Sequence, residues 1–464
     1  MTTTKTILMS LALVLSFIAF GNAAEKAEEA PDQVLFKNVH VWDGTSDERT
    51  DKINVLVEDN LIKKVGAAES DAHKSALVIE GEGKTLMPGM HDQHMHMSLY
   101  VPLAVLRDDM TQMHVGAVSI LRCERLLMNG FTTIRDAGGA SKYLTRVIES
   151  GQALGPRIYH SEALISQTSG HADIRSLTDP HPTLGGHGSK SWADGTVTVL
   201  ADGEAQVKMA VREQLRKGAT QIKIMASGGM SSDFDPIHSV QYSPAEIRAA
   251  VEAAEQWDTY VFAHVFNEAA IAQCIENGVK VLEHIPFLTE KAAKLMVKND
   301  IMFAVGVAPV FSVSEETAQI QYPPAAFAKW KQVRDAATAA LKTIQKTPGM
   351  VENMTIGTDV IPQWQIAVET DAKMNGEINF LAEYFEPVEI LRMLTTNAAR
   401  MNRMTGKLNP YTEGRLGEIS EGAYADLLLV DGNPLEDILL LTDPDKNLKI
   451  IMKDGVIYKN TLGK

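Results

Sequence analysis

The longest regular pattern in the chain is an alternation of short apolar runs with amphipathic segments between residues 87 and 401. Eight apolar runs have the length of buried strands, and they lie at residues 89–97, 131–137, 157–164, 220–226, 260–266, 279–285, 301–307 and 354–360. Strands that alternate with helices form parallel sheets, and eight such units have the size of a (β/α)8 barrel. We therefore predict an α/β fold with a TIM barrel over residues 87–401. The alternative, an open doubly wound sheet, lacks its GxGxxG fingerprint in this sequence.

The clearest amphipathic segment lies at residues 244–257. Ser243 is suited to the N-cap, Pro244 to the first helical position, and Glu246 completes a capping box. Apolar residues then recur on one face at helical spacing, at Ile247, Ala250, Val251 and Ala254. The sequence predicts a helix that packs through this face.

Both ends of the chain carry short apolar runs between turn residues. These runs lie at residues 34–42, 53–65, 77–86, 426–430, 448–452 and 456–458. We predict a small β-sandwich domain formed from both termini, residues 25–86 and 402–464.

The first 24 residues have the pattern of a secretory signal peptide. Lys5 precedes an apolar run at residues 7–20, and small residues follow it. A membrane anchor is the alternative, but this run is shorter than the roughly 20 residues that cross a bilayer. We expect residues 1–24 to be removed on export to the periplasm or outside the cell, which leaves no membrane segment.

The amino-acid composition and net charge of the chain indicate which kinds of molecule it binds. The 464 residues carry a formal net charge of -15, with 22% charged and 45% hydrophobic residues, as in ordinary globular proteins. An acidic balance argues against nucleic-acid binding. The two cysteines, Cys123 and Cys274, lie in helical patterns and are expected to be buried thiols. We expect a small-molecule substrate and a homo-oligomer.

Two histidines one residue apart, His94 and His96, close the first predicted barrel strand. Side chains at i and i+2 of a strand point to the same face, so both imidazoles can reach one metal ion. An HxH pair by itself is also compatible with ordinary polar residues at a strand end.

Further polar residues fall at or near the ends of later apolar strands, where a barrel carries its chemistry. They are Lys223, His264, His284 and Asp359, on the predicted strands 4, 5, 6 and 8. Polar groups in apolar strands are unfavourable unless they are paired or bind a metal. The whole set therefore indicates a metal site.

Several stretches of sequence extend this pattern, namely GFTTIRDAGG at residues 130–139, IKIMASGG at 222–229, GTD at 357–359 and ADLLLVDGNPLEDI at 425–438. With the HxH pair they resemble the binuclear branch of the metal-dependent amidohydrolase superfamily. Within it they are similar to the exported Xaa-Pro dipeptidase-like subgroup, which is related to imidazolonepropionase and includes enzymes that act on dipeptides, N-acyl amino acids and ochratoxin-type amides.

The resemblance implies a ligand set for two divalent metal ions. His94, His96 and Asp359 would bind the more buried ion, and His264 and His284 the second. Lys223 would be N6-carboxylated and bridge both, since an ammonium group cannot ligate a cation whereas a carbamate can. The alternative for Lys223 is a salt bridge to Asp359 or to a neighbouring carboxylate. Histidine-rich ligation favours zinc, although manganese or cobalt would fit.

The expected mechanism uses a metal-activated hydroxide that attacks a polarised carbonyl. Asp359 would be catalytic by taking the proton of the water and returning it to the leaving nitrogen. His171, in SQTSGHAD at residues 166–173, resembles a histidine that acts at the substrate carbonyl, although Ser169 replaces a glycine of that motif. A surface loop histidine is the alternative.

One departure from the subgroup concerns the substrate. Related dipeptidases carry HAY after the histidine of strand 5, whereas this chain has HVF with Phe266. The hydroxyl that would hold a substrate carboxylate is therefore missing. Its role could pass to Arg135, Arg175, His238 or Tyr242, or the substrate could be more apolar.

We therefore predict an exported metal-dependent hydrolase of an amide or peptide bond in a dipeptide or N-acyl amino acid, a dipeptidase or carboxypeptidase in type. Cyclic amide hydrolysis, as in imidazolonepropionase, is one alternative, and lactone or phosphoester hydrolysis on the same metal pair is another. An inactive barrel that serves as a binding protein is the alternative from outside the enzymes.

Overall fold

The computed structural model describes residues 31–101, 103–139, 142–184, 191–232, 234–311, 314–322, 324–360 and 375–463. The predicted signal peptide, residues 1–24, lies outside the described residues. Within the described ranges, no helix has both the length and the apolar character needed to cross a membrane.

Each of the apolar runs predicted for the barrel contains a strand. These strands are β6 (Met90–Met95), β7 (Phe131–Asp136), β8 (Arg157–His160), β11 (Ile222–Met225), β12 (Val261–Val265), β13 (Val281–His284), β14 (Met302–Val305) and β15 (Met354–Ile356). Two further strands, β9 (Leu164–Ser166) and β10 (Thr198–Leu200), lie between β8 and β11. The predicted mixed α/β fold with parallel strands is confirmed.

The parallel strands form two sheets, in the orders β6-β7-β8 and β10-β9-β11-β12-β13-β14-β15. Single backbone hydrogen bonds connect the two sheets on both sides. The Thr220 amide, ahead of β11, donates to His160 O of β8 at 2.9 Å, and the Asp359 amide, after β15, donates to His94 O of β6 at 2.9 Å. These bonds bring the ends of β6 and β15 together.

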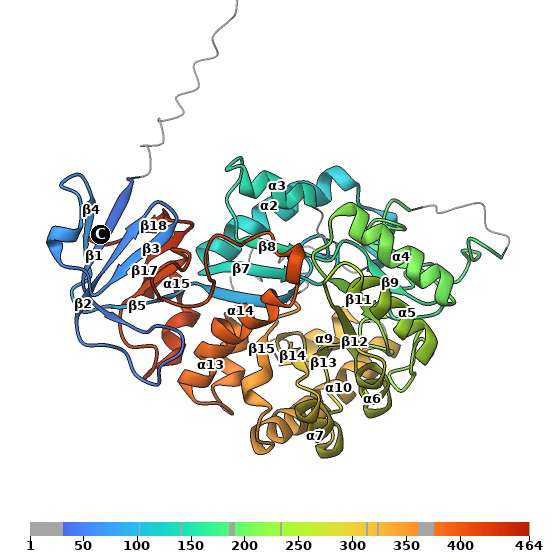
Figure 1. Cartoon of the computed structure of the whole chain (residues 1–464). Coiled ribbons are helices and arrows are strands. Elements are labelled where there is room, and N and C mark those ends of the chain that lie inside the picture. The colour runs from blue at the N-terminus through green and yellow to red at the C-terminus, as the bar shows by residue number, and fades with distance from the viewer. Residues whose placement is uncertain are drawn as a thin grey trace, which may run out of the picture. The chain divides into compact units, whose positions relative to one another are not determined.

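Helices lie between the parallel strands in the sequence and after the last of them, and they surround these strands in Figure 1. They are α1 (Leu103–Asp108), α2 (Gln112–Met128), α3 (Lys142–Glu149), α4 (Glu204–Lys217), α5 (Pro244–Glu255), α6 (Glu268–Glu276), α7 (Glu290–Lys298), α8 (Ala308–Phe311), α9 (Glu315–Gln321), α10 (Pro324–Lys346), α12 (Gly376–Leu381), α13 (Pro387–Leu394) and α14 (Thr396–Arg403). A further short helix, α15 (Pro444–Asn447), lies between two strands of the C-terminal end of the chain. One cluster of buried apolar side chains joins helices to strands, and it includes Leu126, Val211, Ile224, Ile271 and Met296. Cys123 in α2 and Cys274 in α6 are buried free thiols, as predicted.

Helix α5 begins as the sequence predicts. The Glu246 amide donates to Ser243 Oγ at 3.4 Å, and the Ser243 amide donates to Glu246 Oε2 at 2.7 Å. The apolar face of the helix, which includes Ile247 and Ala250, is buried.

We expect Ser243→Ala to lower the free energy of unfolding by about 1 kcal/mol, because it removes the acceptor for a helix amide. Ser243→Asn, which can still cap the helix, is the matched control and should retain the stability of the parent chain. Urea denaturation measures both, and equal midpoints for Ser243→Ala and the parent would contradict the role of the cap.

Strands from both ends of the chain form one eight-stranded sheet, in the order β18-β17-β16-β5-β1-β2-β3 with β4 paired to β1. The strands are β1 (Gln33–Val41), β2 (Ile53–Glu58), β3 (Leu61–Val65), β4 (Leu77–Glu80), β5 (Thr85–Pro88), β16 (Leu427–Val430), β17 (Leu448–Lys453) and β18 (Val456–Asn460). In Figure 1 these blue and red strands lie side by side although they are far apart in the sequence. The predicted β-sandwich domain itself stays a prediction.

A buried ion pair ties this sheet to the parallel strands. Arg157 of β8 binds Asp426 Oδ2 through Nε at 3.0 Å and Asp454 Oδ1 through a terminal nitrogen at 2.6 Å. These three residues are distant in sequence from the predicted metal ligands.

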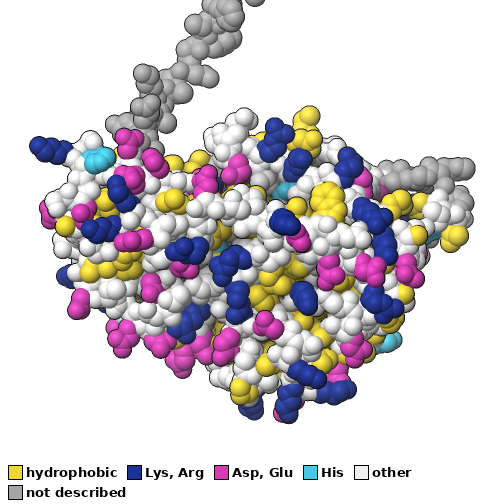
Figure 2. Space-filling view, in the orientation of Figure 1, with side chains coloured by type: hydrophobic (Ala, Val, Ile, Leu, Met, Phe, Trp, Pro, Cys, Tyr) yellow, Lys and Arg dark blue, Asp and Glu magenta, His cyan; other side chains and the backbone are white. Residues whose placement is uncertain are grey.

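On the face drawn in Figure 2, basic and acidic side chains are interspersed among apolar ones. This face therefore carries both signs of charge.

Candidate active site

The HxH pair and Asp359 converge on one point. The Nε2 atoms of His94 and His96 lie 3.3 Å apart, and Asp359 Oδ1 lies 3.7 Å from the first and 3.5 Å from the second. Within the described residues these three side chains form a group that could hold a metal ion, with ligand atoms within 4.8 Å of one another. Asp359 Oδ1 is buried and has no hydrogen-bond partner there. A buried oxygen without a donor, facing two ring nitrogens, fits a cation.

The two later histidines extend this group. The His284 ring lies 4.6 Å from that of His94 and 4.8 Å from that of His264, measured between centroids. His284 Nδ1 is 3.9 Å from Asp359 Oδ2. Burial is the main cause that lowers the pKa of His94, His264 and His284 well below the usual value. The next largest cause is Lys223 for His94 and His284, and His171 for His264. Neutral rings keep a lone pair for a metal.

Lys223 of β11 is, together with His94, the most buried of the predicted ligands, with only 1% of its surface exposed. Its ammonium lies 5.1 Å from the centroid of the Phe262 ring. Burial lowers its pKa to about 8, while Glu283 and Asp359 act in the opposite direction. No carboxylate oxygen of the described residues comes within 4.0 Å of its nitrogen, so the alternative of a salt bridge to Asp359 is not formed there.

Asp359 is held by the backbone rather than by its own carboxylate. Its φ is +48°, and its amide bonds to β6 through His94 O. Asp92 joins the same two segments, since it accepts from the His94 amide at 2.9 Å and from Thr358 Oγ1 at 2.6 Å. Burial raises the pKa of Asp359 to about 7; Lys223 lowers it, and Glu283 and Asp92 raise it.

Two positions in the GTD and IKIMASGG stretches require glycine, because the backbone there packs closely against histidine side chains. A Cβ at Gly357 would lie 2.5 Å from His94 Cβ, and one at Gly229 would lie 2.2 Å from the His171 ring. Any larger residue would displace a site histidine. The GTD and SGG stretches therefore have a steric basis.

His171 lies at the site and not on the surface. Its ring stacks on that of His264, with centroids 4.2 Å apart and planes 18° apart. Nδ1 lies 3.0 Å from Asp235 Oδ2. Burial alone would raise the pKa of Asp235, but His171, Lys329 and the Gly229 amide lower it, with His171 the largest of the three.

A lysine from a distant helix fixes the loop that carries Asp235. Lys329 of α10 donates to the carbonyl oxygens of Gly229, Ser232 and Asp235 at 3.1, 2.7 and 2.6 Å. These bonds use all three of its donor hydrogens. Neither Asp235 nor Lys329 could be identified from the sequence, because only folding brings segments 94 residues apart into contact.

The predicted substrate residues differ in position. The Phe266 ring stacks on His264 with centroids 4.6 Å apart, so it lies at the site. Tyr242 is buried with φ +61°, and its hydroxyl has no hydrogen-bond partner within the described part of the chain. His238 is exposed, and Arg175 pairs with Asp173 at 2.6 Å.

Arg135 was one candidate for a substrate contact, but its side chain contacts other residues of the protein. It is fully buried, and its guanidinium binds Glu283, Gln93 O and Tyr260 Oη. Its hydrogen-bonding groups therefore serve the protein interior.

Glu283 is a site residue that the sequence analysis missed. It precedes His284 in β13, and neighbours in a strand normally point to opposite faces. Here φ is +70° at His284, which breaks the alternation. Both side chains reach His94, Glu283 through a hydrogen bond to Nδ1 and His284 through its ring.

Comparison with known proteins agrees with this geometry. The family model described as "Amidohydrolase family" matches residues 85–458. The chain belongs to the amidohydrolase family. This amidohydrolase is 31% identical over 427 residues to ochratoxinase of Aspergillus niger, an alignment that covers 87% of this chain and 82% of the relative. The predicted enzyme class, a hydrolase of amide bonds, is confirmed by the family.

Solved structures similar to this amidohydrolase include a prolidase in complex with N-methylphosphonate-L-proline. That structure is 32% identical with a TM-score of 0.82, over 92% of this chain and 100% of the other. A Xaa-Pro dipeptidase with methionine bound in its active site is 25% identical with a TM-score of 0.77, over 92% and 100%.

Proposed function

We propose that this amidohydrolase is an exported, binuclear metal-dependent enzyme that cleaves the amide or peptide bond of a dipeptide or N-acyl amino acid. The observation that carries the proposal is the convergence of His94, His96 and Asp359, with ligand atoms within 4.8 Å of one another. Two similar solved structures, a prolidase and a Xaa-Pro dipeptidase, support the proposed substrate class.

We further propose that the parallel strands close into one (β/α)8 barrel, beside a sandwich formed from both termini. The hydrogen bonds from Thr220 to His160 and from Asp359 to His94 support closure, because they link the two sheets on both sides. In such a barrel the site lies where the strands end.

His94, His96 and Asp359 would hold one ion, and His264 and His284 the other. Carboxylated Lys223 would bridge them, a role supported by its burial and by the absence of a carboxylate within 4.0 Å among the described side chains. Zinc is the proposed metal. When bound, such ions lower the pKa of a water molecule and polarise a carbonyl.

The side chains supply proton transfer and orientation. Asp359 would take the proton of the attacking water at its carboxylate and return it to the leaving nitrogen. His171, held through Nδ1 by Asp235, would donate a hydrogen bond from Nε2–H to the substrate carbonyl oxygen, with a proton on both ring nitrogens. Phe266 and Tyr242 would line the pocket.

A substrate panel tests the proposal. We expect purified, metal-loaded enzyme to hydrolyse N-acyl amino acids or dipeptides at least about 100-fold faster, in kcat/KM, than cyclic amides, lactones or phosphotriesters. Preference for any of the latter three classes would replace the proposed substrate with that class.

Phe266→Tyr tests how the enzyme recognises a substrate carboxylate. We expect KM for an N-acyl amino acid to fall roughly 10-fold, with kcat nearly unchanged, because one charge-assisted hydrogen bond is added. The C-terminal amide of the same substrate should show no change, and Phe266→Leu is the control without a hydroxyl. An equal gain for the amide would contradict carboxylate recognition at this position.

A further inference from the structure

A series of buried, hydrogen-bonded side chains extends from His94 away from the candidate active site. Glu283, which is 0% exposed, contacts His94 Nδ1 with one carboxylate oxygen and accepts from Arg135 with the other. Arg135 also donates to Gln93 O at 2.7 Å and to Tyr260 Oη at 3.3 Å.

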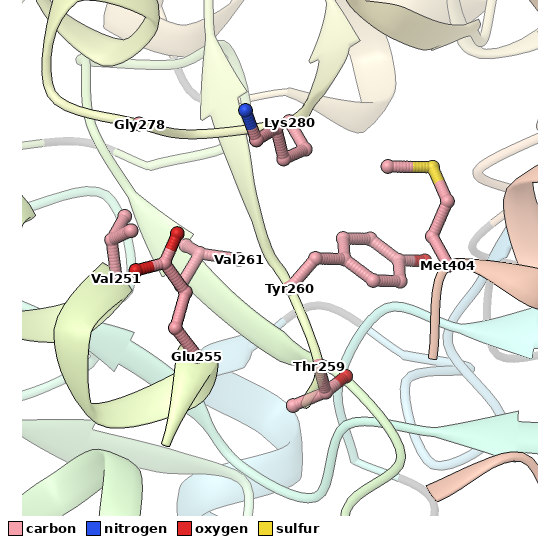
Figure 3. A pocket seen from close by; sticks show the side chains of 8 residues that line it. All are labelled: Val251, Glu255, Thr259, Tyr260, Val261, Gly278, Lys280 and Met404. Atoms are coloured by element: carbon pink, nitrogen blue, oxygen red, sulfur yellow. The ribbon is translucent and has the colours of Figure 1, made fainter. Parts of the chain in front are cut away.

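The last of these side chains, Tyr260, lies at the ends of the strands opposite to the predicted metal ligands. Tyr260 lies just ahead of β12 and lines a cavity of about 240 Å³ together with Val251, Glu255, Lys280 and Met404 (Figure 3). His264 and His284 lie at the other ends of β12 and β13. These hydrogen-bonded side chains therefore extend from the predicted metal ligands to the opposite ends of the strands.

The contact between Glu283 and His94 decides which ring nitrogen can bind a metal. A neutral imidazole carries one N–H, and only its other nitrogen has a lone pair for a ligand bond. If Nδ1–H donates to Glu283, the lone pair of Nε2 faces His96 Nε2 at 3.3 Å and Asp359 Oδ1 at 3.7 Å. His96 is arranged in the same way, since its Nδ1 lies 2.9 Å from Gly138 O.

We propose that Glu283 is a positioning residue that holds His94 in the Nδ1–H tautomer for metal binding, and that Arg135 fixes the Glu283 carboxylate in place. This inference rests on the proposed metal-dependent function. Carboxylates that orient ligand histidines typically change metal affinity 10- to 100-fold when they are removed.

The competing explanation is that Glu283 only neutralises the buried Arg135. Removing one partner of a buried ion pair leaves an uncompensated charge, whereas removing both is often tolerated. A double variant, Glu283→Leu with Arg135→Met, therefore separates the two explanations. It removes both charges and leaves no hydrogen-bond acceptor at His94 Nδ1.

Glu283→Gln has a specific effect at the ring. Arg135 can only donate, so it orients the glutamine oxygen toward itself and leaves the amide NH2 facing His94 Nδ1. That arrangement favours the Nε2–H tautomer, which has no lone pair toward Asp359. We expect the dissociation constant for one of the two ions to rise about 10- to 100-fold.

The experiment is Co²⁺ titration of the metal-free full-length chain against a chromophoric chelator, with the absorption spectrum and the urea midpoint recorded for each variant. We expect weakened binding in Glu283→Gln, and binding that stays weak in the double variant while its urea midpoint recovers. Asp426→Asn, which changes another buried arginine–carboxylate pair, is the matched control and should bind Co²⁺ as the parent does. Glu283→Asp keeps the charge but withdraws the oxygen, and should fold with intermediate affinity.

Two results would overturn the positioning role while leaving the proposed function intact. One is parent-like affinity in Glu283→Gln, and the other is a double variant that regains affinity together with stability. A parent chain that binds no Co²⁺ would overturn both the inference and the proposed function.

Discussion

Asp359→Asn should reduce kcat at least about 1000-fold while the chain stays folded and keeps most of its metal. Asparagine retains the shape and one oxygen near His94 and His96 but cannot take a proton from water. Its tolerance of a left-handed backbone matches the φ of +48° at this position. The measurements are kcat, metal content and the circular dichroism spectrum.

Asp258→Asn is the matched control for this substitution. Asp258 also has a left-handed backbone, with φ +58°, but lies on the surface in an ion pair with Lys407. We expect parent-like activity from it. Undiminished activity in Asp359→Asn would refute the proton-transfer role.

Lys223→Ala should lower kcat at least about 1000-fold and reduce the bound metal, because the bridging anion is lost. The substitution also leaves a void at a fully buried position. A short carboxylate such as propionate fits that void and offers the oxygens of a carbamate, so we expect it to restore part of the activity in a saturable manner.

Lys453→Ala is the control for a buried lysine in another environment. Lys453 is also buried, but its ammonium donates to Gly155 O at 2.9 Å and contacts none of the proposed ligands. We expect reduced stability, parent-like activity and no response to propionate. Full activity and full metal content in Lys223→Ala without added carboxylate would contradict a bridging lysine.

Much of the fold could be predicted because local patterns determine it. Strands such as β11, β12 and β14 lie in runs that are mostly apolar, and the start of α5 follows from the capping chemistry of Ser243 and Glu246. The ligand candidates could be found for the same reason, since each is a polar residue in or next to a strand that is otherwise apolar. The structure gathers His94, His96, His264, His284 and Asp359 at one place.

The remaining site residues depend on contacts that no local pattern encodes. Glu283 pairs with Arg135 over 148 positions, and strand alternation places it on the wrong face unless the backbone at His284 is known. Arg135 was one of four residues considered for a substrate carboxylate, because Phe266 lacks the hydroxyl that would hold it. Its guanidinium binds Glu283, which lies on a strand that the sequence does not place beside it.

The central claim, catalysis by two metal ions held by this ligand set, is tested most directly by adding metal to the metal-free enzyme while activity on an N-acyl amino acid is followed. We predict that activity rises with added Zn²⁺ and reaches its plateau at two bound ions per chain. Full activity with at most one ion per chain would contradict the claim.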